Sequence, residues 1–143
     1  MAHTNVMKVS KILSKNDTGE TGGHQAGILV PKKEQLLNFF PRLDGTVKNP
    51  RITLNFIDDF NICWQFNYIY YNNKFFGGTR DEYRLTCMTP YIKKYKLSEG
   101  DTVTFSREQD DYTISCKVID CDDTQGQDEH IIKLSDKWRV IKI

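Results

Sequence analysis

Between residues 51 and 71, apolar side chains recur at every second position, with one short polar interruption. Because successive side chains of a β-strand point to opposite faces of a sheet, this period predicts two half-buried strands, at 51–56 and 62–71. Residues 58–61 (DDFN), which lie between them, predict a hairpin turn. The side chains expected on one face are Ile52, Leu54, Phe56, Ile62, Trp64, Phe66, Tyr68 and Tyr70.

Short alternating stretches separated by turn residues continue along the chain and predict further strands at 25–30, 81–87, 102–106, 112–119, 131–134 and 138–143. Pro31 and Pro90 each precede apolar residues at helical spacing and predict two short helices. With residues 81–87 counted only as a candidate strand, about seven strands with two short helices favour a mainly β fold, a seven-stranded antiparallel barrel-like sheet. Residues 1–8 are expected to form a flexible tail and residues 9–143 a single domain.

The formal net charge of +1 excludes a uniformly basic nucleic-acid coat protein, but the charge is distributed unevenly. Residues 1–54 carry eight Lys or Arg against four Asp or Glu, and residues 74–98 carry six against two. Residues 99–129 carry two against ten. This polarity indicates a charged partner. No apolar run is long enough to cross a membrane and the N-terminus lacks the apolar middle of a signal peptide, so we expect a cytoplasmic protein.

The common signatures of catalysis and metal binding are missing from the sequence. It contains no phosphate-binding P-loop, no Gly-x-Ser-x-Gly elbow and no His-Glu-x-x-His helix. The four cysteines and three histidines lack zinc spacing, so we expect buried thiols and no metal or cofactor. A small Mg²⁺-dependent nuclease that uses the acidic 99–129 stretch, with Asp101 and Asp120, stays as an alternative, although a solvated acidic face explains such a run better.

A polar, glycine-rich segment at residues 14–25 (SKNDTGETGGHQ) is the first candidate binding loop. Its glycines free backbone N–H groups to approach a phosphate, and Lys15 adds a positive charge. Asn16, His24 and Gln25 carry the donor and acceptor groups that read base edges. A merely flexible, solvated loop has the same composition and remains an alternative.

The second candidate is the segment RDEYR at residues 80–84. If it is extended, Arg80, Glu82 and Arg84 share one face. Arginine pairs with guanine and glutamate accepts from the cytosine amino group, so this row suits G·C pairs in a major groove. An ion-pair lattice on a solvated face is the competing interpretation. Stacking of single-stranded bases on the nearby aromatic residues is another interpretation. Alternation, however, favours Tyr68 and Tyr70 as core residues.

Two long motifs extend these observations to a known family. SKNDTGETGGHQAGILVP at 14–31 and IYYNNKFFGGTRDEYRLT at 69–86 resemble the two recognition arms of the N-terminal, effector-binding domain of EcoRII-type (type IIE) restriction endonucleases, in the same order. LSEGDTVTF at 97–105 resembles a strand of the wider DNA-binding pseudobarrel group that includes plant B3-type domains. We therefore name residues 15–25 the first arm and residues 71–84 the second arm.

The resemblance implies a seven-stranded pseudobarrel that grips double-stranded DNA in the major groove at a CCWGG-like site, where W is A or T. It implies a prokaryotic restriction system in which this domain binds an uncleaved effector copy of the site. The nuclease active site belongs to a separate C-terminal domain. We expect a monomer, because two arms can read a near-palindrome without dimerising.

Carried onto this sequence, the family pattern assigns two sets of residues. The base-reading set is Arg80, Glu82, Arg84, Asn16, Asp17, His24 and Gln25, and the DNA-backbone set is Lys15, Tyr71, Asn73, Lys74 and Thr79. The chain departs from the family arm at Gly78 and Tyr83, where the resemblance places lysines. Two fewer charges are expected to lower DNA affinity and to flatten its salt dependence. A β-barrel that binds another protein and has no nucleic-acid role remains an alternative.

Overall fold

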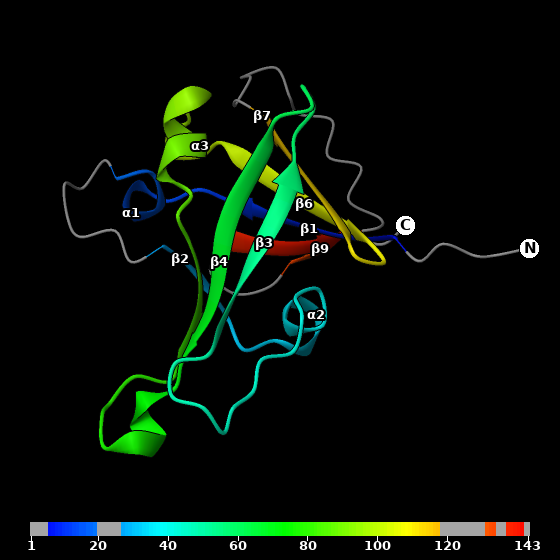
Figure 1. Ribbon diagram of the computed structural model, residues 1–143. Coiled ribbons are helices and arrows are strands. Elements are labelled where there is room, and N and C mark those ends of the chain that lie inside the picture. The colour runs from blue at the N-terminus through cyan, green and yellow to red at the C-terminus, as the bar shows by residue number, and fades with distance from the viewer. Residues whose placement is uncertain (1–5, 20–26, 118–130, 134–136, 142–143) are drawn as a thin grey trace, which may run out of the picture.

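The computed structural model describes residues 6–19, 27–117, 131–133 and 137–141, which form one curled sheet with short helices around it (Figure 1). Its nine strands are ordered β2-β5-β4-β3-β7-β6-β1-β9-β8. The elements are β1 Val6–Ile12, α1 Lys15–Thr18, β2 Ile28–Val30, α2 Glu34–Leu37, β3 Arg51–Ile57, β4 Cys63–Tyr71, the 3₁₀ helix η1 Asn73–Phe76, β5 Glu82–Thr86, α3 Thr89–Lys94, β6 Thr102–Glu108, β7 Asp111–Lys117, β8 Ile131–Lys133 and β9 Trp138–Ile141.

The predicted β3–β4 hairpin is confirmed. The two strands pair antiparallel from Arg51 opposite Ile69 to Ile57 opposite Cys63. Leu54 and Phe66 lie opposite each other and are both buried, as the alternation requires. The hairpin is therefore fixed by its own sequence pattern.

The sheet is neither seven-stranded nor wholly antiparallel, and these two predictions are wrong. β7 runs parallel to β3 over a short stretch, with Phe56 beside Tyr112 and Ile57 beside Thr113. The Phe56 and Tyr112 rings lie 5.2 Å apart, centre to centre, so the parallel joint is packed through aromatic contact. Alternation tells which side chains face inward, but it carries no information on which strand lies next to which or in which direction.

The first strand starts inside the segment expected to be a tail. Residues 6–8 pair with Glu108, Arg107 and Ser106 of β6, and β1 also pairs with β9. Two of the three central positions of β1 are polar, and the inward position after Val9 is a lysine, Lys11, which is 5% exposed. A buried lysine interrupts the apolar alternation, and for this reason the strand was not predicted.

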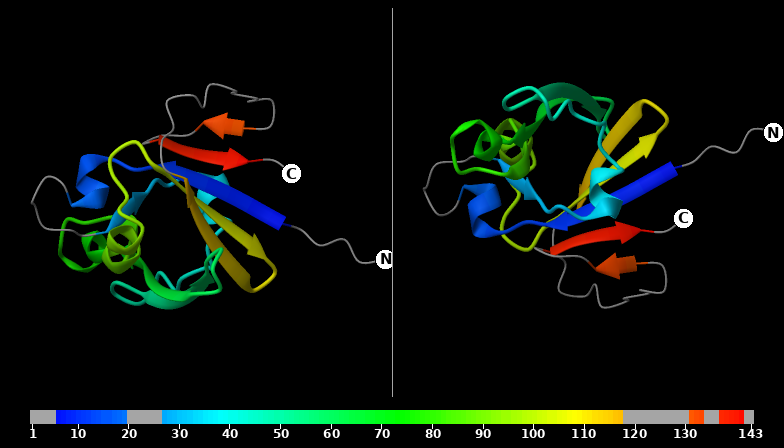
Figure 2. Two further views of the ribbon diagram at one scale, coloured as in Figure 1. Left: turned by 90° about the horizontal axis from the view of Figure 1, so that it is seen from above. Right: turned by 90° about the horizontal axis from the view of Figure 1, so that it is seen from below.

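The curled sheet is held closed by a side-chain contact rather than by a continuous ladder. The Trp138 indole N–H of β9 donates to the Leu29 carbonyl of β2 over 2.9 Å, and these strands stand near opposite ends of the strand order. Seen from above and below, the strands surround a common centre (Figure 2). That centre is filled by large side chains that are almost fully buried, among them Leu13, Ile28, Leu36, Phe39, Phe56, Phe66, Tyr68, Leu85, Phe105, Ile114 and Trp138.

The predicted helices are found at both places but are short: α2 begins at Glu34, three residues after Pro31, and α3 spans six residues. Two further helical turns, α1 and η1, lie in segments that were expected to be loops. The prediction of buried thiols is wrong for the cysteines that the structure describes, because Cys63 and Cys87 are exposed and Cys116 is half-buried. Cys121 lies outside the described residues. Among the described residues, no helix is long and apolar enough to cross a membrane.

The turn between β3 and β4 is organised by the carboxylate of Asp58, which is 7% exposed. One oxygen accepts from the backbone N–H groups of Phe60 and Ile62 over 2.8 and 2.9 Å. The other accepts from the Trp64 indole over 2.9 Å and from the Tyr95 hydroxyl. Burial raises the pKa of Asp58, but these hydrogen bonds outweigh it and lower the pKa to about 2. The charged form is therefore the one that the fold stabilises.

Asp58→Ala is expected to lower the free energy of unfolding by about 2–4 kcal/mol, because it leaves several partly buried donors without their acceptor. Asp59→Ala, at the exposed neighbour, is expected to change it by less than about 0.5 kcal/mol. Since the folded pKa of Asp58 lies below its unfolded value of about 3.9, its stabilisation is present above that value and lost as the pH falls toward 2. Urea unfolding of both variants from pH 6 to pH 2 measures this, and an unchanged gap at low pH would contradict it.

Candidate nucleic-acid interface

The two arms flank one short pair of strands. β2 and β5 are antiparallel, with Ile28 opposite Leu85 and Val30 opposite Tyr83. The first arm leads into β2 at its Ile28 end, and the second arm leads into β5 at its Glu82 end. Because the strands run in opposite directions, the arms lie at opposite ends of this pair, and Figure 1 shows α1 and η1 on the same side of the sheet. The two arms therefore reach this strand pair from opposite ends.

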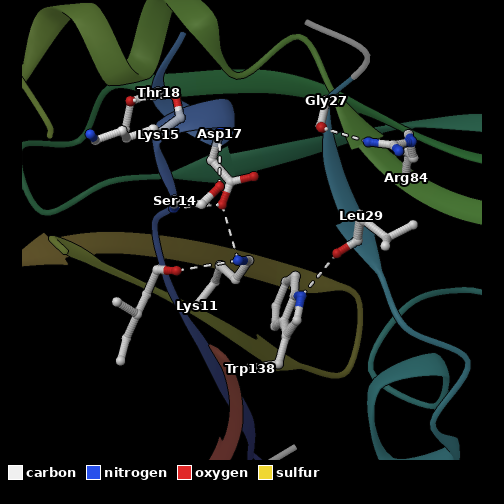
Figure 3. Close-up of polar contacts among 10 residues, drawn as sticks. Lys11, Ser14, Lys15, Asp17, Thr18, Gly27, Leu29, Arg84 and Trp138 are labelled. Carbon is white, nitrogen blue, oxygen red and sulfur yellow. Dashed lines mark hydrogen bonds and ion pairs between the residues drawn. The ribbon is translucent and has the colours of Figure 1, made fainter. Parts of the chain in front are cut away.

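The first arm starts with a capped helical turn. The Ser14 hydroxyl accepts from the Asp17 backbone N–H over 3.1 Å, and the Asp17 carboxylate accepts from the Ser14 N–H over 3.0 Å. This reciprocal capping box explains why the segment forms α1. The same Asp17 carboxylate makes a 3.0 Å ion pair with Lys11, and both side chains are buried (Figure 3). Asp17 therefore holds the arm on β1, and these contacts favour a positioning role over base reading.

Lys15 and Asn16 are exposed on α1, where both side chains are accessible to a ligand. His24 and Gln25, the other predicted readers of the first arm, lie outside the described residues. The structure thus leaves Lys15 and Asn16 at the surface of the first arm, and the roles of His24 and Gln25 stay predictions.

The second arm is shaped by Asn73. Its side-chain oxygen accepts from the Arg80 backbone N–H over 2.6 Å, and its carbonyl accepts from the Gly78 N–H over 2.6 Å. A Cβ on Gly78 would stand 2.7 Å from the Asn73 side chain, so the loop closes only with glycine there. Lys74 and Thr79 are exposed on the arm, whereas the Asn73 side chain is occupied in holding it.

Asn72 was missed by the sequence analysis, although it anchors the second arm to the body. Its side chain is fully buried and donates to the carbonyls of Gly45 and Val47 over 3.2 and 2.9 Å. Its oxygen accepts from the Asn49 N–H over 2.6 Å. The Asn-Asn pair indicated a turn, but nothing in the sequence distinguished the buried Asn72 from its half-buried neighbour Asn73.

The predicted row of Arg80, Glu82 and Arg84 is on one face, as alternation required. Arg80 Nη2 lies 3.0 Å from Glu82 Oε2, and Arg84 Nε pairs with the same oxygen. The Arg80 guanidinium also stacks on the Tyr71 ring, 3.8 Å from its centre. Burial raises the pKa of Glu82, but the hydrogen bonds from Arg84 and Arg80 hold it below its usual value. The free protein thus contains the ion-pair lattice, with two cations oriented around one carboxylate.

The other face of β5 packs inward. The Tyr83 ring stacks on Tyr70 at 4.2 Å and on Tyr68 at 5.7 Å, centre to centre. Asp81 accepts from the Tyr70 hydroxyl over 2.7 Å and pairs with Lys32. Tyr68 is a core residue, as alternation indicated, whereas Tyr70 is only half-buried. Because the Tyr83 side chain stacks inward, it takes no part in the Arg-Glu-Arg row.

The two arms are connected across β2 and β5. Arg84 Nη1 donates to the Gly27 carbonyl over 3.0 Å, at the junction of the first arm with β2 (Figure 3). A Cβ on Gly27 would stand 2.5 Å from the Leu85 carbonyl oxygen, and its φ is +90°, so glycine is required there. A cavity of about 300 Å³ lies beside this contact, lined by Lys11, Ser14, Asn16, Asp17, Leu29, Arg84 and Lys137. Residues of both arms therefore share one hollow.

A larger cavity, of about 740 Å³, lies on the inward side of the same strands, where Tyr68 and Tyr83 line it together with α2 and the segment after it. It contains none of the predicted base-reading residues. Within the described ranges, no group of three His, Cys, Asp or Glu residues gathers to hold a metal ion. Asp101, proposed above for a nuclease, is buried and accepts from the Ser98 N–H over 2.7 Å, and Asp120 lies outside the described residues.

Comparison with known proteins agrees with this geometry. The family described as "Restriction endonuclease EcoRII, N-terminal" matches residues 2–136, nearly the whole chain. This chain belongs to the EcoRII N-terminal family. The type II restriction enzyme EcoRII of Escherichia coli is 42% identical over 81 residues, which cover 53% of this chain and 19% of that enzyme.

Two plant proteins extend the relationship of this EcoRII N-terminal family member. A B3 domain-containing protein of Oryza sativa subsp. japonica is 31% identical over 98 residues, covering 68% of this chain and 21% of the plant protein. The chain thus matches only about a fifth of the length of these relatives. The solved structure of an Arabidopsis FUS3–DNA complex has a TM-score of 0.60 at 21% identity, covering 77% of this chain and 96% of that one. The pseudobarrel fold is therefore shared with the B3 domain.

Proposed function

We propose that this chain binds double-stranded DNA sequence-specifically, inserting the Arg80–Glu82–Arg84 row into the major groove while the two arms grip the site from its ends. The observation that carries the proposal is this row, prealigned on one face of β5 and joined to the first arm through Gly27. Membership in the EcoRII N-terminal family and the fold shared with a DNA-bound B3 domain support it.

The chemistry of the row follows from its residue types. Each guanidinium can donate two hydrogen bonds to O6 and N7 of guanine, and the carboxylate can accept from the cytosine amino group. Pairing with Glu82 and stacking on Tyr71 restrict the arginines before DNA arrives, which lowers the entropy cost of ordering them. A row with this composition suits a site that ends in G·C pairs, and we propose CCWGG, the site of the EcoRII-type enzymes.

We further propose that the domain acts as an effector-binding module, as a monomer, for a nuclease domain carried elsewhere in a longer protein. The support is the family membership, together with the match to about a fifth of the restriction enzyme's length. Lys15, Lys74, Thr79 and Tyr71 are proposed as contacts to the DNA backbone, with Asn16, His24 and Gln25 as readers from the first arm.

A titration at near-physiological salt tests the proposal. A short CCWGG duplex is compared with a scrambled duplex and with the separate strands, with and without Mg²⁺. The CCWGG duplex is expected to bind about 10³-fold or more tightly than the scrambled one, without cleavage. Equal binding of all duplexes would overturn the target. Preference for single strands would favour the aromatic residues as a stacking surface, and Mg²⁺-dependent cleavage would favour the nuclease.

A further inference from the structure

The cavity shared by the two arms has one lining residue that comes from the last part of the chain. Lys137 precedes β9 and lines the hollow with Asn16 of the first arm and Arg84 of the second. Neither the sequence patterns nor the family motifs assigned it a role, because both candidate motifs end before residue 87.

The position of Lys137 is fixed by its neighbour. The Trp138 side chain is fully buried, and its indole donates to the Leu29 carbonyl, also in the lining of the cavity (Figure 3). Lys137 has a φ of +66°, a left-handed conformation that costs a non-glycine residue about 1–2 kcal/mol. Such strain persists only where surrounding contacts impose it. The buried tryptophan thus holds the backbone that carries the lysine at the edge of the hollow.

Of the three cations that line the cavity, Lys137 is the one that forms no ion pair with a described residue. Lys11 is paired with Asp17 inside the protein, and Arg84 is paired with Glu82. Among the residues that the structure describes, no carboxylate lies within ion-pair distance of Lys137, and its side chain is exposed. Three cations and one carboxylate line the cavity, so its surroundings favour an anion.

We propose that Lys137 is a third DNA contact, which binds a backbone phosphate of the duplex held between the two arms. This inference rests on the proposed function, since the duplex must lie across β2 and β5 for a phosphate to reach the cavity. A lysine ammonium is a compact point charge on a flexible stem, which suits a phosphate better than the edge of a base. The contact is therefore expected to add affinity without adding sequence preference.

Two substitutions test the contact, each with a matched control. Lys137→Ala removes the charge, and Lys137→Gly removes it while relieving the left-handed strain. Lys96 is also exposed and also has a positive φ, +53°, but lies beyond α3 and lines neither this cavity nor the one beside Tyr83. Lys96→Ala and Lys96→Gly are the controls, and thermal melting verifies that each variant is folded.

Both Lys137 variants are expected to bind CCWGG and scrambled duplexes about three- to tenfold more weakly, by a similar factor for each. The slope of log K against log salt is expected to become shallower by about 0.9, the value of one phosphate contact. The Lys96 variants are expected to keep both affinity and slope. DNA affinity is also measured with chloride replaced by inorganic phosphate at equal ionic strength. Free phosphate is expected to compete with the duplex if the cavity is a general anion site, and to have no effect if the cavity takes only a phosphate of the duplex.

Neutral methylphosphonate linkages, placed one at a time in the duplex, locate the contact. One position is expected to weaken binding of the wild-type chain while leaving Lys137→Gly unaffected. Unchanged affinity and salt slope in folded Lys137 variants would overturn this inference while leaving selective binding, and so the proposed function, intact. If the wild-type chain bound all duplexes equally, but the Lys137 variants still had a shallower salt slope, only the CCWGG assignment would be overturned. Failure of the wild-type chain to bind any duplex would overturn both.

Discussion

Arg84→Ala is expected to weaken binding to the CCWGG duplex by about 10- to 100-fold while changing binding to scrambled DNA far less. A bidentate arginine–guanine contact discriminates by about 1–3 kcal/mol, and Arg84 carries one of the two guanidinium groups of the row. Its removal also frees Glu82 from one partner and breaks the 3.0 Å contact with the Gly27 carbonyl, so the first arm loses a support. Competition titrations against both duplexes measure the change in selectivity.

Lys74→Ala is the matched control for this experiment, because Lys74 is an exposed cation on the same arm but outside the row. It is expected to weaken cognate and scrambled duplexes alike, as loss of a backbone contact does. If Arg84→Ala also lowered both affinities by one factor, Arg84 would be a phosphate contact and the proposed readout would be wrong. Arg80→Ala tests the second guanidinium in the same way.

Asp17→Asn is expected to lower the free energy of unfolding by about 3–5 kcal/mol. Asparagine retains an oxygen that can accept from the Ser14 N–H, so the cap of α1 can persist. It removes the negative charge, however, and leaves the buried Lys11 ammonium without its 3.0 Å ionic partner. Removing one member of a buried pair is costly because the other stays desolvated and unpaired. Urea unfolding measures the loss, and DNA affinity is expected to fall as the first arm loosens.

Asp44→Asn is the control, since Asp44 also accepts hydrogen bonds from a turn, at Thr46, but is exposed and forms no ion pair with any residue that the structure describes. Its cost is expected to stay below about 1 kcal/mol. Lys11→Met combined with Asp17→Asn is expected to recover much of the lost stability, because an apolar side chain needs no ionic partner. Equal losses for Asp17→Asn and Asp44→Asn would contradict the structural role of the buried pair.

The two substitutions separate two functions of the arms. Arg84 belongs to the surface proposed to contact DNA, and Asp17 belongs to the support beneath it, although the sequence motif presents both as polar residues of a recognition arm. Selectivity is expected to follow the first and stability the second. The support is buried against β1, and the surface residues remain accessible between the arms.

Sequence reasoning predicted the local features well, because each depends on residues close together in the chain. Alternation fixed the β3–β4 hairpin and the shared face of Arg80, Glu82 and Arg84, since side-chain direction has a period of two along a strand. The inward stacking of Tyr68 follows from the same rule. The family resemblance added the two arms and their partner, which periodicity alone left open.

Other features were decided only by contacts between distant parts of the chain. The β1 strand is completed by β6 and β9, and its inward Lys11 is tolerated only because Asp17 folds over it. The parallel joint of β3 with β7 and the closure through Trp138 and Leu29 bring together strands that are remote in sequence. Periodicity fixes which face of a strand is buried, but burial itself, and with it the role of a polar side chain, is set by what packs on that face in three dimensions.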